Sequence, residues 1–444
     1  MMSQPAAMLS RDCSEADAER ARPAADLRMV VPFARPSLER EEEQAVLRVL
    51  RSGWLTTGIE ALAFEQEFAV SIRAPHTLAV SSATAALHLA LQACGVGPGD
   101  LVVTTAYTFV ATAHAIRHAG AEPVFVDIDP HTLNIDPRAV QHACAALGTR
   151  AWGEAPRGHL ARARRARVAA VLPVHIAGLP CDMSALRDLC DHYRIPLVED
   201  AAHAFPVETD AGFAGTLGDC GAFSFYANKT ITTGEGGMLV TRHREVAQRA
   251  AALRLHGIDR AVWRHEREDA AREPRSGSGS LTRRGDYDVV ALGFKYNMSD
   301  LAAAIGREQL RRVGSLTQRR GILAERYLRD LGDCPGLRMP TSHPAHCWHL
   351  FVIHVDESRL GITRDDLARR LGDRGIATSV HFRPLHTTTY YRQRSPSPRW
   401  VANLPHCERA GVSALSLPLY PTLGEAEQSY IIEQLRALVA SVIS

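Results

Sequence analysis

Short apolar runs with the composition of β-strands alternate along this chain with stretches of helical length. The strand-like runs cover residues 77–80, 101–105, 123–127, 168–174 and 195–198, and helical patterns lie between them, as at residues 108–119 and 183–193. Because this alternation is typical of β-α-β units, it predicts an α/β fold with a mainly parallel sheet and helices on both faces. Ligands of such sheets bind at the carboxyl ends of the strands. Residues that directly follow a strand are therefore the first candidates for a site.

The composition is that of a globular protein without a dominant charge. Hydrophobic residues make up 46% of the chain, and the net charge is only +2, so nothing favours nucleic acid or an anionic membrane as a partner. The nine cysteines form no Cys-x-x-Cys pair and no zinc-like spacing with histidine, which indicates reduced thiols, a cytoplasmic location and no metal site. Charged residues near the N-terminus argue against a signal peptide, and no apolar run is long enough to span a bilayer.

The length of 444 residues predicts two domains. We expect a mobile tail over residues 1–27, a large ligand-binding domain over residues 28–310 and a smaller C-terminal α/β domain over residues 311–444, with a long helical stretch at residues 301–331 linking the two. In the smaller domain, strands are expected at residues 349–355 and 377–382. Two segments interrupt the pattern and are interpreted as surface loops: an arginine-rich one at residues 148–167 and a charged, Ser-Gly-rich one at residues 260–284.

A lysine between a strand-like run and a glycine cluster is the first candidate for catalysis. Residues 222–226 are β-prone, Lys229 follows, and residues 234–237 read Gly-Glu-Gly-Gly. Glycines let the backbone turn sharply and approach a ligand closely. Burial would lower the pKa of the lysine and free its amine to form a Schiff base. The alternative is an ordinary solvated lysine beside a hairpin.

Two other strand ends carry polar groups. Residues 81–91 follow a strand with a Ser- and Thr-containing turn and a helix, so their free N–H groups could bind an anion near Thr84 and Ala85, although simple N-capping would use the same residues. Asp200 ends another strand, with His203 close behind, and it could instead cap the next helix. Together with Lys229 these features match one cofactor, pyridoxal 5′-phosphate, whose phosphate, ring nitrogen and aldehyde need such a set.

Further polar segments are candidates for binding a substrate. Residues 52–58 place Trp54 and Thr56 in a polar turn, which either faces a ligand or is only a turn. Donors for a polar, anionic ligand are dense in residues 381–386 and 390–392, and the candidates there are His381, Arg383, His386 and Tyr391.

These motifs together resemble the DegT-type nucleotide-sugar aminotransferases, which are fold-type I enzymes that use pyridoxal phosphate. The resemblance covers the chain from Val31 onward except for the two loops, and residues 52–58, 81–85, 199–203, 224–237 and 296–300 carry it. Within the family the chain is most similar to the UDP-4-amino-4-deoxy-L-arabinose–oxoglutarate aminotransferases, through residues 348–351, residues 381–386 and the Tyr-Tyr pair at residues 390–391.

The resemblance implies a homodimer with active sites shared between the subunits. Around the cofactor ring, it implies that Phe109 stacks, Asp200 pairs with the ring nitrogen, His203 lies beside the ring hydroxyl and Lys229 holds the aldehyde.

The resemblance also implies how the phosphate of the cofactor is held. Thr84, Ala85 and Ser224 would bind it from one subunit, and Asn297 would reach it from the partner subunit.

The expected reaction is transfer of an amino group from L-glutamate, which becomes 2-oxoglutarate, to a nucleotide-linked keto sugar such as a UDP-4-keto pentose or a related 4-keto sugar. A catalytically idle sugar-nucleotide-binding regulator is the alternative from another class, but it would not need Lys229, Asp200 and Thr84 together. A pyridoxal-phosphate-dependent sugar dehydratase would carry histidine in place of Lys229. A nicotinamide-dependent oxidoreductase is disfavoured because no strand is followed by Gly-x-Gly-x-x-Gly.

Overall fold

The computed structural model describes residues 29–154, 166–258, 287–394 and 403–443. The predicted tail at residues 1–27 and the predicted loop at residues 260–284 lie outside the described residues, as does most of the loop at residues 148–167.

A mainly parallel β-sheet forms the centre of the larger part of the molecule, which confirms the predicted α/β class. Its strands are ordered β1-β9-β8-β5 and β3-β2-β4, and parallel bridges from Val171 to Leu197 and from Val174 to Asp200 join the two sets. β9 runs antiparallel to both of its neighbours, β1 and β8, whereas the other strand pairs described in this sheet are parallel. The strand bounds are β1 (His76–Val80), β2 (Asp100–Thr105), β3 (Glu122–Val126), β4 (Arg167–Leu172), β5 (Val198–Asp200), β8 (Cys220–Ser224) and β9 (Gly237–Thr241), with a small hairpin of β6 (Glu208–Thr209) and β7 (Gly212–Phe213).

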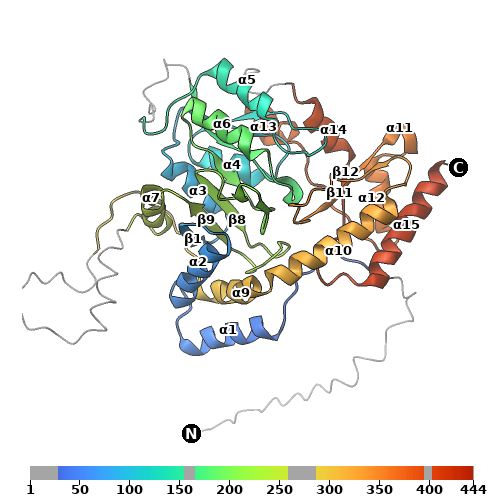
Figure 1. Ribbon diagram of the computed structural model, residues 1–444, viewed down its shortest axis with the longest axis horizontal. Helices are drawn as coiled ribbons and strands as arrows, with labels where there is room; N and C mark the ends of the chain where they lie inside the picture. The colour runs from blue at the N-terminus through green and yellow to red at the C-terminus, as the bar shows by residue number, and fades with distance from the viewer. Residues whose placement is uncertain (1–28, 155–165, 259–286, 395–402, 444) are drawn as a thin grey trace, which may run out of the picture.

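Helices cover both faces of this sheet because alternate strand residues point to opposite sides and both sets are apolar. On one face, Val102 of β2 shares a core with α3 (Ala83–Ala93), α4 (Val110–His118) and α7 (Arg244–Arg254). On the other face, Leu101 and Val103 pack with α5 (Pro137–Leu147) and α6 (Met183–Tyr193). The helices α1 (Arg40–Ser52), α2 (Ile59–Ser71) and α9 (Asp300–Arg311) pack on one another below β1 and β9 (Figure 1).

A second, antiparallel sheet lies in the C-terminal part, with strand order β10-β11-β12. Its strands are β10 (Leu337–Arg338), β11 (Phe351–Val355) and β12 (Ala414–Leu417), and they share a core with α10 (Val313–Leu331), α12 (Arg364–Gly372) and α15 (Glu425–Ile443). Shorter helices are η2 (Ile176–Gly178), α11 (Glu357–Leu360), η3 (Leu385–Thr387), α13 (Thr389–Arg394) and α14 (Pro405–Ser413). In Figure 1, α9 and α10 run diagonally from below the large sheet to this C-terminal part.

Two predicted elements differ from the structure. The long helix expected at residues 301–331 is broken into α9 and α10 at Arg312, which ends one helix and begins the next. The strand expected at residues 377–382 does not form; only Ser379 pairs, with Ser416 of β12. The chain then leaves β12 and crosses to the large sheet, where the N–H of Leu385 donates to the carbonyl of Ala106.

Arg150 corrects the interpretation of the arginine-rich segment as a solvated loop. Its guanidinium is buried and donates two hydrogen bonds to the carboxylate of Asp100, of 2.9 and 2.8 Å, and one of 2.9 Å to the carbonyl of Gly95. A buried, bidentate arginine–carboxylate pair is among the stronger polar contacts in proteins. Arg150 therefore anchors the start of β2 and belongs to the core.

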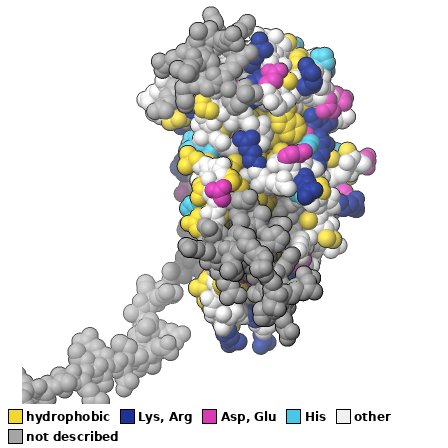
Figure 2. Space-filling view, turned by 90° about the vertical axis from the view of Figure 1, so that its left-hand side faces the viewer, with side chains coloured by type: hydrophobic (Ala, Val, Ile, Leu, Met, Phe, Trp, Pro, Cys, Tyr) yellow, Lys and Arg dark blue, Asp and Glu magenta, His cyan; other side chains and the backbone are white. Residues whose placement is uncertain are grey.

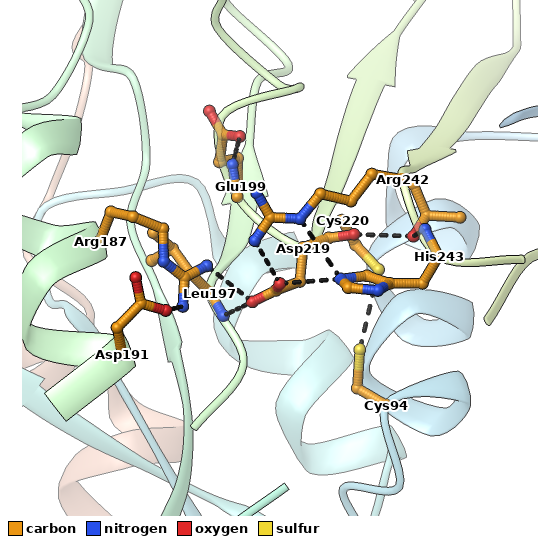
Figure 3. A network of polar contacts seen from close by, with 11 residues as sticks. Cys94, Arg187, Asp191, Leu197, Glu199, Asp219, Cys220, Arg242 and His243 are labelled. Atoms are coloured by element: carbon orange, nitrogen blue, oxygen red, sulfur yellow. Dashed lines mark hydrogen bonds and ion pairs between the residues drawn. The ribbon is translucent and has the colours of Figure 1, made fainter. Parts of the chain in front are cut away.

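A buried carboxylate fixes the start of β8, the strand that leads toward Lys229. Figure 3 shows Asp219 accepting hydrogen bonds from the side chains of Arg187, Arg242 and His243, and its carboxylate also accepts 2.8 Å from the N–H of Leu197. These partners hold the pKa of Asp219 below its usual value, although burial alone would raise it. The contacts tie α6, β8 and the turn after β9 together.

The surface shows no single field of charge on the face drawn in Figure 2, where the basic side chains of the described residues lie among acidic, apolar and neutral ones. Among the described residues, no helix is both long enough and apolar enough to cross a membrane.

Candidate active site

The N-terminus of α3 lies at the carboxyl end of the large sheet. Ser82 caps this helix through its Oγ, which accepts 3.1 Å from the N–H of Ala85. Gly237 of β9 passes so close that a Cβ there would lie 2.6 Å from the nitrogen of Ala83. This close approach explains why the cluster at residues 234–237 ends in a glycine. It also brings Ser224, which pairs with Gly237, to the same place as Thr84 and Ala85.

Asp200 ends β5 and is almost fully buried. One carboxylate oxygen accepts 2.8 Å from the hydroxyl of Thr112 in α4, and the other accepts 3.1 Å from the N–H of Ala202. Burial raises the pKa of Asp200, whereas these two donors and the charge of Lys229 lower it. The carboxylate is thus held in a fixed orientation at the end of the strand.

Lys229 follows β8 in a turn in which its own N–H donates 2.9 Å to the carbonyl of Tyr226. Burial lowers the pKa of its amine to about 8, while the charge of Asp200 acts in the opposite direction. The Nζ atom lies 3.3 Å from Nε2 of His349. An amine with this pKa is partly unprotonated near neutral pH, as a nucleophile or base must be.

Three aromatic side chains line the space beside Lys229. The rings of His203 and His349 have centroids 4.4 Å apart, and Phe382 stacks on His203 at 5.8 Å with an interplanar angle of 18°. Nδ1 of His203 accepts 3.3 Å from the N–H of Ala177. Burial and the charge of Lys229 hold the pKa of His203 well below its usual value, so this ring is neutral.

Phe109 precedes α4 and stands at the open side of this space. Its side chain is 58% exposed, and its only ring contact among the described residues is Phe382, at 6.2 Å. An exposed aromatic ring above buried polar groups can stack on a planar ligand.

The donor set fits pyridoxal 5′-phosphate. Asp200 and Lys229 influence each other's pKa, yet neither is in an ion pair among the described residues. A buried carboxylate needs a cationic or hydrogen-bond-donating partner, and a buried amine needs an acceptor or an electrophile. The basic ring nitrogen of the cofactor suits the carboxylate of Asp200, and its aldehyde suits the amine of Lys229. The start of α3, with Ser224 beside it, matches a phosphate.

The loop with Trp54 and Thr56 is tied to Asn297. Nδ2 of Asn297 donates 2.6 Å to the hydroxyl of Thr57, and this hydroxyl donates 2.6 Å to the carbonyl of Met298. The Trp54 side chain is half exposed, and its indole N–H donates 3.2 Å to the carbonyl of Thr57. The loop and the segment around Asn297 therefore form one unit at the molecular surface.

Asp300 secures this unit. Its carboxylate is buried and accepts from the N–H groups of Gly58 at 2.6 Å, Ala61 at 3.0 Å and Glu60 at 3.3 Å, so it caps the start of α2. Its own N–H donates 3.2 Å to the carbonyl of Thr56.

Of the four predicted substrate residues in the C-terminal part, only His381 lies close to Lys229. Burial and the charge of Lys229 lower the pKa of His381 to about 4. Arg383 is exposed and donates to Thr387, and His386 contacts Glu408 at 3.1 Å.

The structure does not support the expectation that Tyr391 binds substrate. Its side chain is buried in the core of the large sheet, with its ring 5.3 Å from that of Phe125 and 6.0 Å from that of His114. The polar composition of residues 390–392 suggested a binding segment, but α13 turns Tyr391 inward.

The sequence analysis did not propose Thr112, His349 or Arg320 as site residues, although His349 lies in the segment at residues 348–351 that carried a family resemblance. Thr112 could have been found from its position near the start of the helix that follows a predicted strand. Arg320 is buried in α10 and donates to the carbonyls of Leu419 at 2.8 Å and His349 at 3.2 Å. It lowers the pKa of Lys229 from more than 90 residues away along the chain, a distance that no local pattern reveals.

Comparison with known proteins gives consistent matches. A family model described as the DegT/DnrJ/EryC1/StrS aminotransferase family matches residues 36–436. The spore coat polysaccharide biosynthesis protein SpsC of Bacillus subtilis is 40% identical over 412 residues, which cover 92% of this chain and 97% of that protein.

Solved structures agree with this match. The PLP-form of Spr1654 from Streptococcus pneumoniae is 28% identical to this chain, with a TM-score of 0.77. The match covers 94% of this chain and 100% of that chain. DesI, solved in the presence of its TDP-sugar product, is 30% identical with a TM-score of 0.76, and 95% of each chain is covered.

Proposed function

Because this chain belongs to the DegT/DnrJ/EryC1/StrS aminotransferase family, whose members use pyridoxal 5′-phosphate, we propose that it transfers an amino group from L-glutamate to the keto carbon of a nucleotide-linked sugar. The observation that carries this proposal is the buried pair of Asp200 and Lys229, which face one space without an ion-pair partner among the described residues. We expect the reaction to take place in the cytoplasm.

The two charged residues have separate roles in this proposal. When bound, the cofactor supplies an electron sink for the bond that breaks at the amino-group carbon. Asp200 keeps a proton on the ring nitrogen, and Thr112 and the N–H of Ala202 hold its carboxylate in place. Lys229 would hold the cofactor and would then serve as the base at the carbon that bears the amino group, for which a pKa of about 8 is suitable.

The remaining cofactor contacts follow from the strand ends. We propose that the N–H groups and hydroxyl at Thr84 and Ala85, with the hydroxyl of Ser224, bind the phosphate. Phe109 stacks on the ring, and neutral His203 lies beside the ring hydroxyl.

We propose a UDP-4-keto pentose or a related 4-keto sugar as the acceptor. Support comes from the similarity of residues 348–351 to the UDP-4-amino-4-deoxy-L-arabinose–oxoglutarate aminotransferases and from DesI, whose product is a TDP-sugar. Trp54, Thr56, His381, Arg383 and His386 are the proposed substrate contacts.

Incubation with L-glutamate and a panel of nucleotide-linked 4-keto sugars tests this function. We expect a new amino sugar, detected by mass spectrometry, together with one equivalent of 2-oxoglutarate. The panel should include UDP- and TDP-linked pentoses and hexoses so that the preferred nucleotide and sugar emerge. Formation of 2-oxoglutarate without any aminated sugar across the panel would contradict the proposed acceptor class while leaving the cofactor chemistry intact.

We also propose that two chains share each active site, with Asn297 reaching the phosphate of its partner. Support comes from the unit formed by Asn297 and residues 54–58 at the molecular surface and from exposed apolar side chains beside it. Ile59 is 71% exposed and Leu292 is 92% exposed, and such side chains are typical of surfaces that a second chain covers.

Mixing two variants, each with one lesion in the proposed site, tests whether the site is shared. Asn297→Ala chains carry an intact lysine, and Lys229→Ala chains carry an intact asparagine. If Asn297 acts across the interface, a mixed dimer has one fully intact site, so mixing should restore about half of the wild-type activity per mixed dimer. Lys229→Ala mixed with Asp200→Asn is the matched control, because each of these lesions lies in the site of its own chain, so neither site of the mixed dimer is intact. If the mixture of Asn297→Ala and Lys229→Ala shows no more activity than the Asn297→Ala parent, although mixed dimers are shown to form, the shared site is refuted.

A further inference from the structure

We propose that His349 is a positioning residue for Lys229 and that His349 and Asn228 together bind one buried water molecule, which fixes the tautomer of His349. The inference rests on the proposed function for its catalytic meaning. The geometry that carries it involves only residues of this chain: the contact of His349 with Lys229, two buried polar atoms and the cavity between them.

The contact with Lys229 determines where the ring proton of His349 lies. Nε2 of His349 is 3.3 Å from Nζ of Lys229. A lysine ammonium has three donors and no acceptor, so it can bond to Nε2 only if this nitrogen is unprotonated. The proton of a neutral imidazole must then be on Nδ1. His349 is neutral because burial, assisted by the charges of Lys229 and Arg320, holds its pKa well below its usual value.

Nδ1 of His349 is buried and has no hydrogen-bond partner among the described residues. The carbonyl oxygen of the Asn228 side chain is also buried and also has no hydrogen-bond partner among the described residues. The first atom is a donor in the tautomer that Lys229 requires, and the second is an acceptor. Leaving such atoms unpaired costs free energy, so each needs a partner.

Both residues line one small cavity of about 10 Å³. The other lining residues are mainly apolar: Phe33, Ala34, Leu350, Leu417 and Leu419. A volume of this size corresponds to about one water molecule, and a buried water needs at least two polar partners. Nδ1–H of His349 supplies a donor for this water, and the side-chain oxygen of Asn228 supplies an acceptor. The water joins the turn that carries Lys229 to the chain segment before β11.

The main chain of His349 is also held in place. Arg320 donates to its carbonyl at 3.2 Å, and the ring of His203 packs against its ring at 4.4 Å. The bond to the main-chain carbonyl, the contact with the ring of His203 and the water on Nδ1 together hold the imidazole of His349. Its Nε2 is therefore presented to Lys229 in one orientation.

The acceptor should stabilise the protonated form of Lys229 and so raise its pKa, in opposition to burial. The other groups that influence this amine are Asp200, which raises its pKa, and Arg320, which lowers it. Cys347 is also close, but burial raises the pKa of its thiol to about 12, so it is uncharged at neutral pH. Burial and the charge of Lys229 lower the pKa values of His203 and His381, so both rings are neutral.

The test measures Lys229 in the full-length protein without cofactor, where the sugar plays no part. The chain has only two lysines, Lys229 and Lys295, so the rate at which an amine reagent such as trinitrobenzenesulfonate modifies each can be followed by peptide mapping. The rate for Lys229 rises with pH as its amine loses its proton, which gives its pKa. We expect His349→Phe to lower this pKa by about 1 and His349→Gln, which retains an acceptor, to restore most of it.

A second pair of variants tests the water. Asn228→Leu should lower the pKa of Lys229 when His349 is present and should have no further effect in His349→Phe, because the water acts only through the ring. His354→Phe, a change of another buried histidine nearby in the chain, is the matched control and should leave the pKa of Lys229 unchanged. An unchanged pKa in His349→Phe would overturn the positioning role. Independent effects of Asn228→Leu and His349→Phe would overturn the bridging water. Neither outcome depends on the aminotransferase reaction, so it is distinguishable from failure of the proposed function.

Discussion

Replacement of Lys229 with alanine should lower the rate of amino transfer by roughly a thousandfold or more, because the variant loses both the covalent hold on the cofactor and the base that moves the proton. The fold should persist. The turn at residue 229 is maintained by the main-chain bond from its N–H to the carbonyl of Tyr226, which alanine can also form. Single-turnover kinetics with L-glutamate, together with circular dichroism, measure the two effects separately.

The only other lysine of the chain gives a matched control. Lys295 is exposed in its contact with Asn297, so Lys295→Ala should retain its capacity for the glutamate half-reaction. Borohydride reduction of the wild-type holoenzyme should attach the cofactor irreversibly to the amine that holds it. Peptide mapping then has two possible side-chain positions, and a label on Lys295 would show that the assignment of Lys229 is wrong.

Asp200→Asn should slow the glutamate half-reaction by roughly a hundredfold or more, because a neutral amide cannot keep a proton on the ring nitrogen. The side chains have nearly the same shape, so the contacts with Thr112 and the N–H of Ala202 can largely remain. Stopped-flow absorbance after addition of L-glutamate measures this step before any sugar is present.

Thr112→Val is the control for Asp200→Asn. It removes the hydroxyl that donates to Asp200 but leaves the carboxylate, so its effect should be several times smaller. A half-reaction of normal rate in Asp200→Asn would rule out the proposed role of the carboxylate.

The fold class could be predicted because alternating apolar patterns are local. Strand and helix periods are visible within ten residues, and β1, β2 and α6 lie close to where the patterns indicated. The burial of Arg150 could not be predicted, because its partner Asp100 lies 50 residues away and only the folded sheet brings them together. The break at Arg312 was missed because the sequence there contains no proline and its apolar period continues.

Part of the cluster around Lys229 could be predicted from the sequence for the same reason. Asp200 and Ser224 each end a strand and Lys229 follows one. The carboxyl ends of parallel strands meet at one edge of a sheet. His349 and Arg320 come from the C-terminal part, whose position against the large sheet no local pattern encodes. Tyr391 shows the converse: a polar neighbourhood along the chain does not reveal which way a short helix turns its side chains.

The capping of α2 by Asp300 has a consequence for exchanging parts between related proteins. The loop at residues 54–58 and the segment at residues 296–300 are more than 200 residues apart, yet Asp300 and Asn297 bond directly to the loop. A loop transplanted alone would meet a carboxylate and an amide positioned for a different backbone. The two segments must therefore be inherited, recombined or grafted as a pair, and a chimera with its crossover between them would break that match.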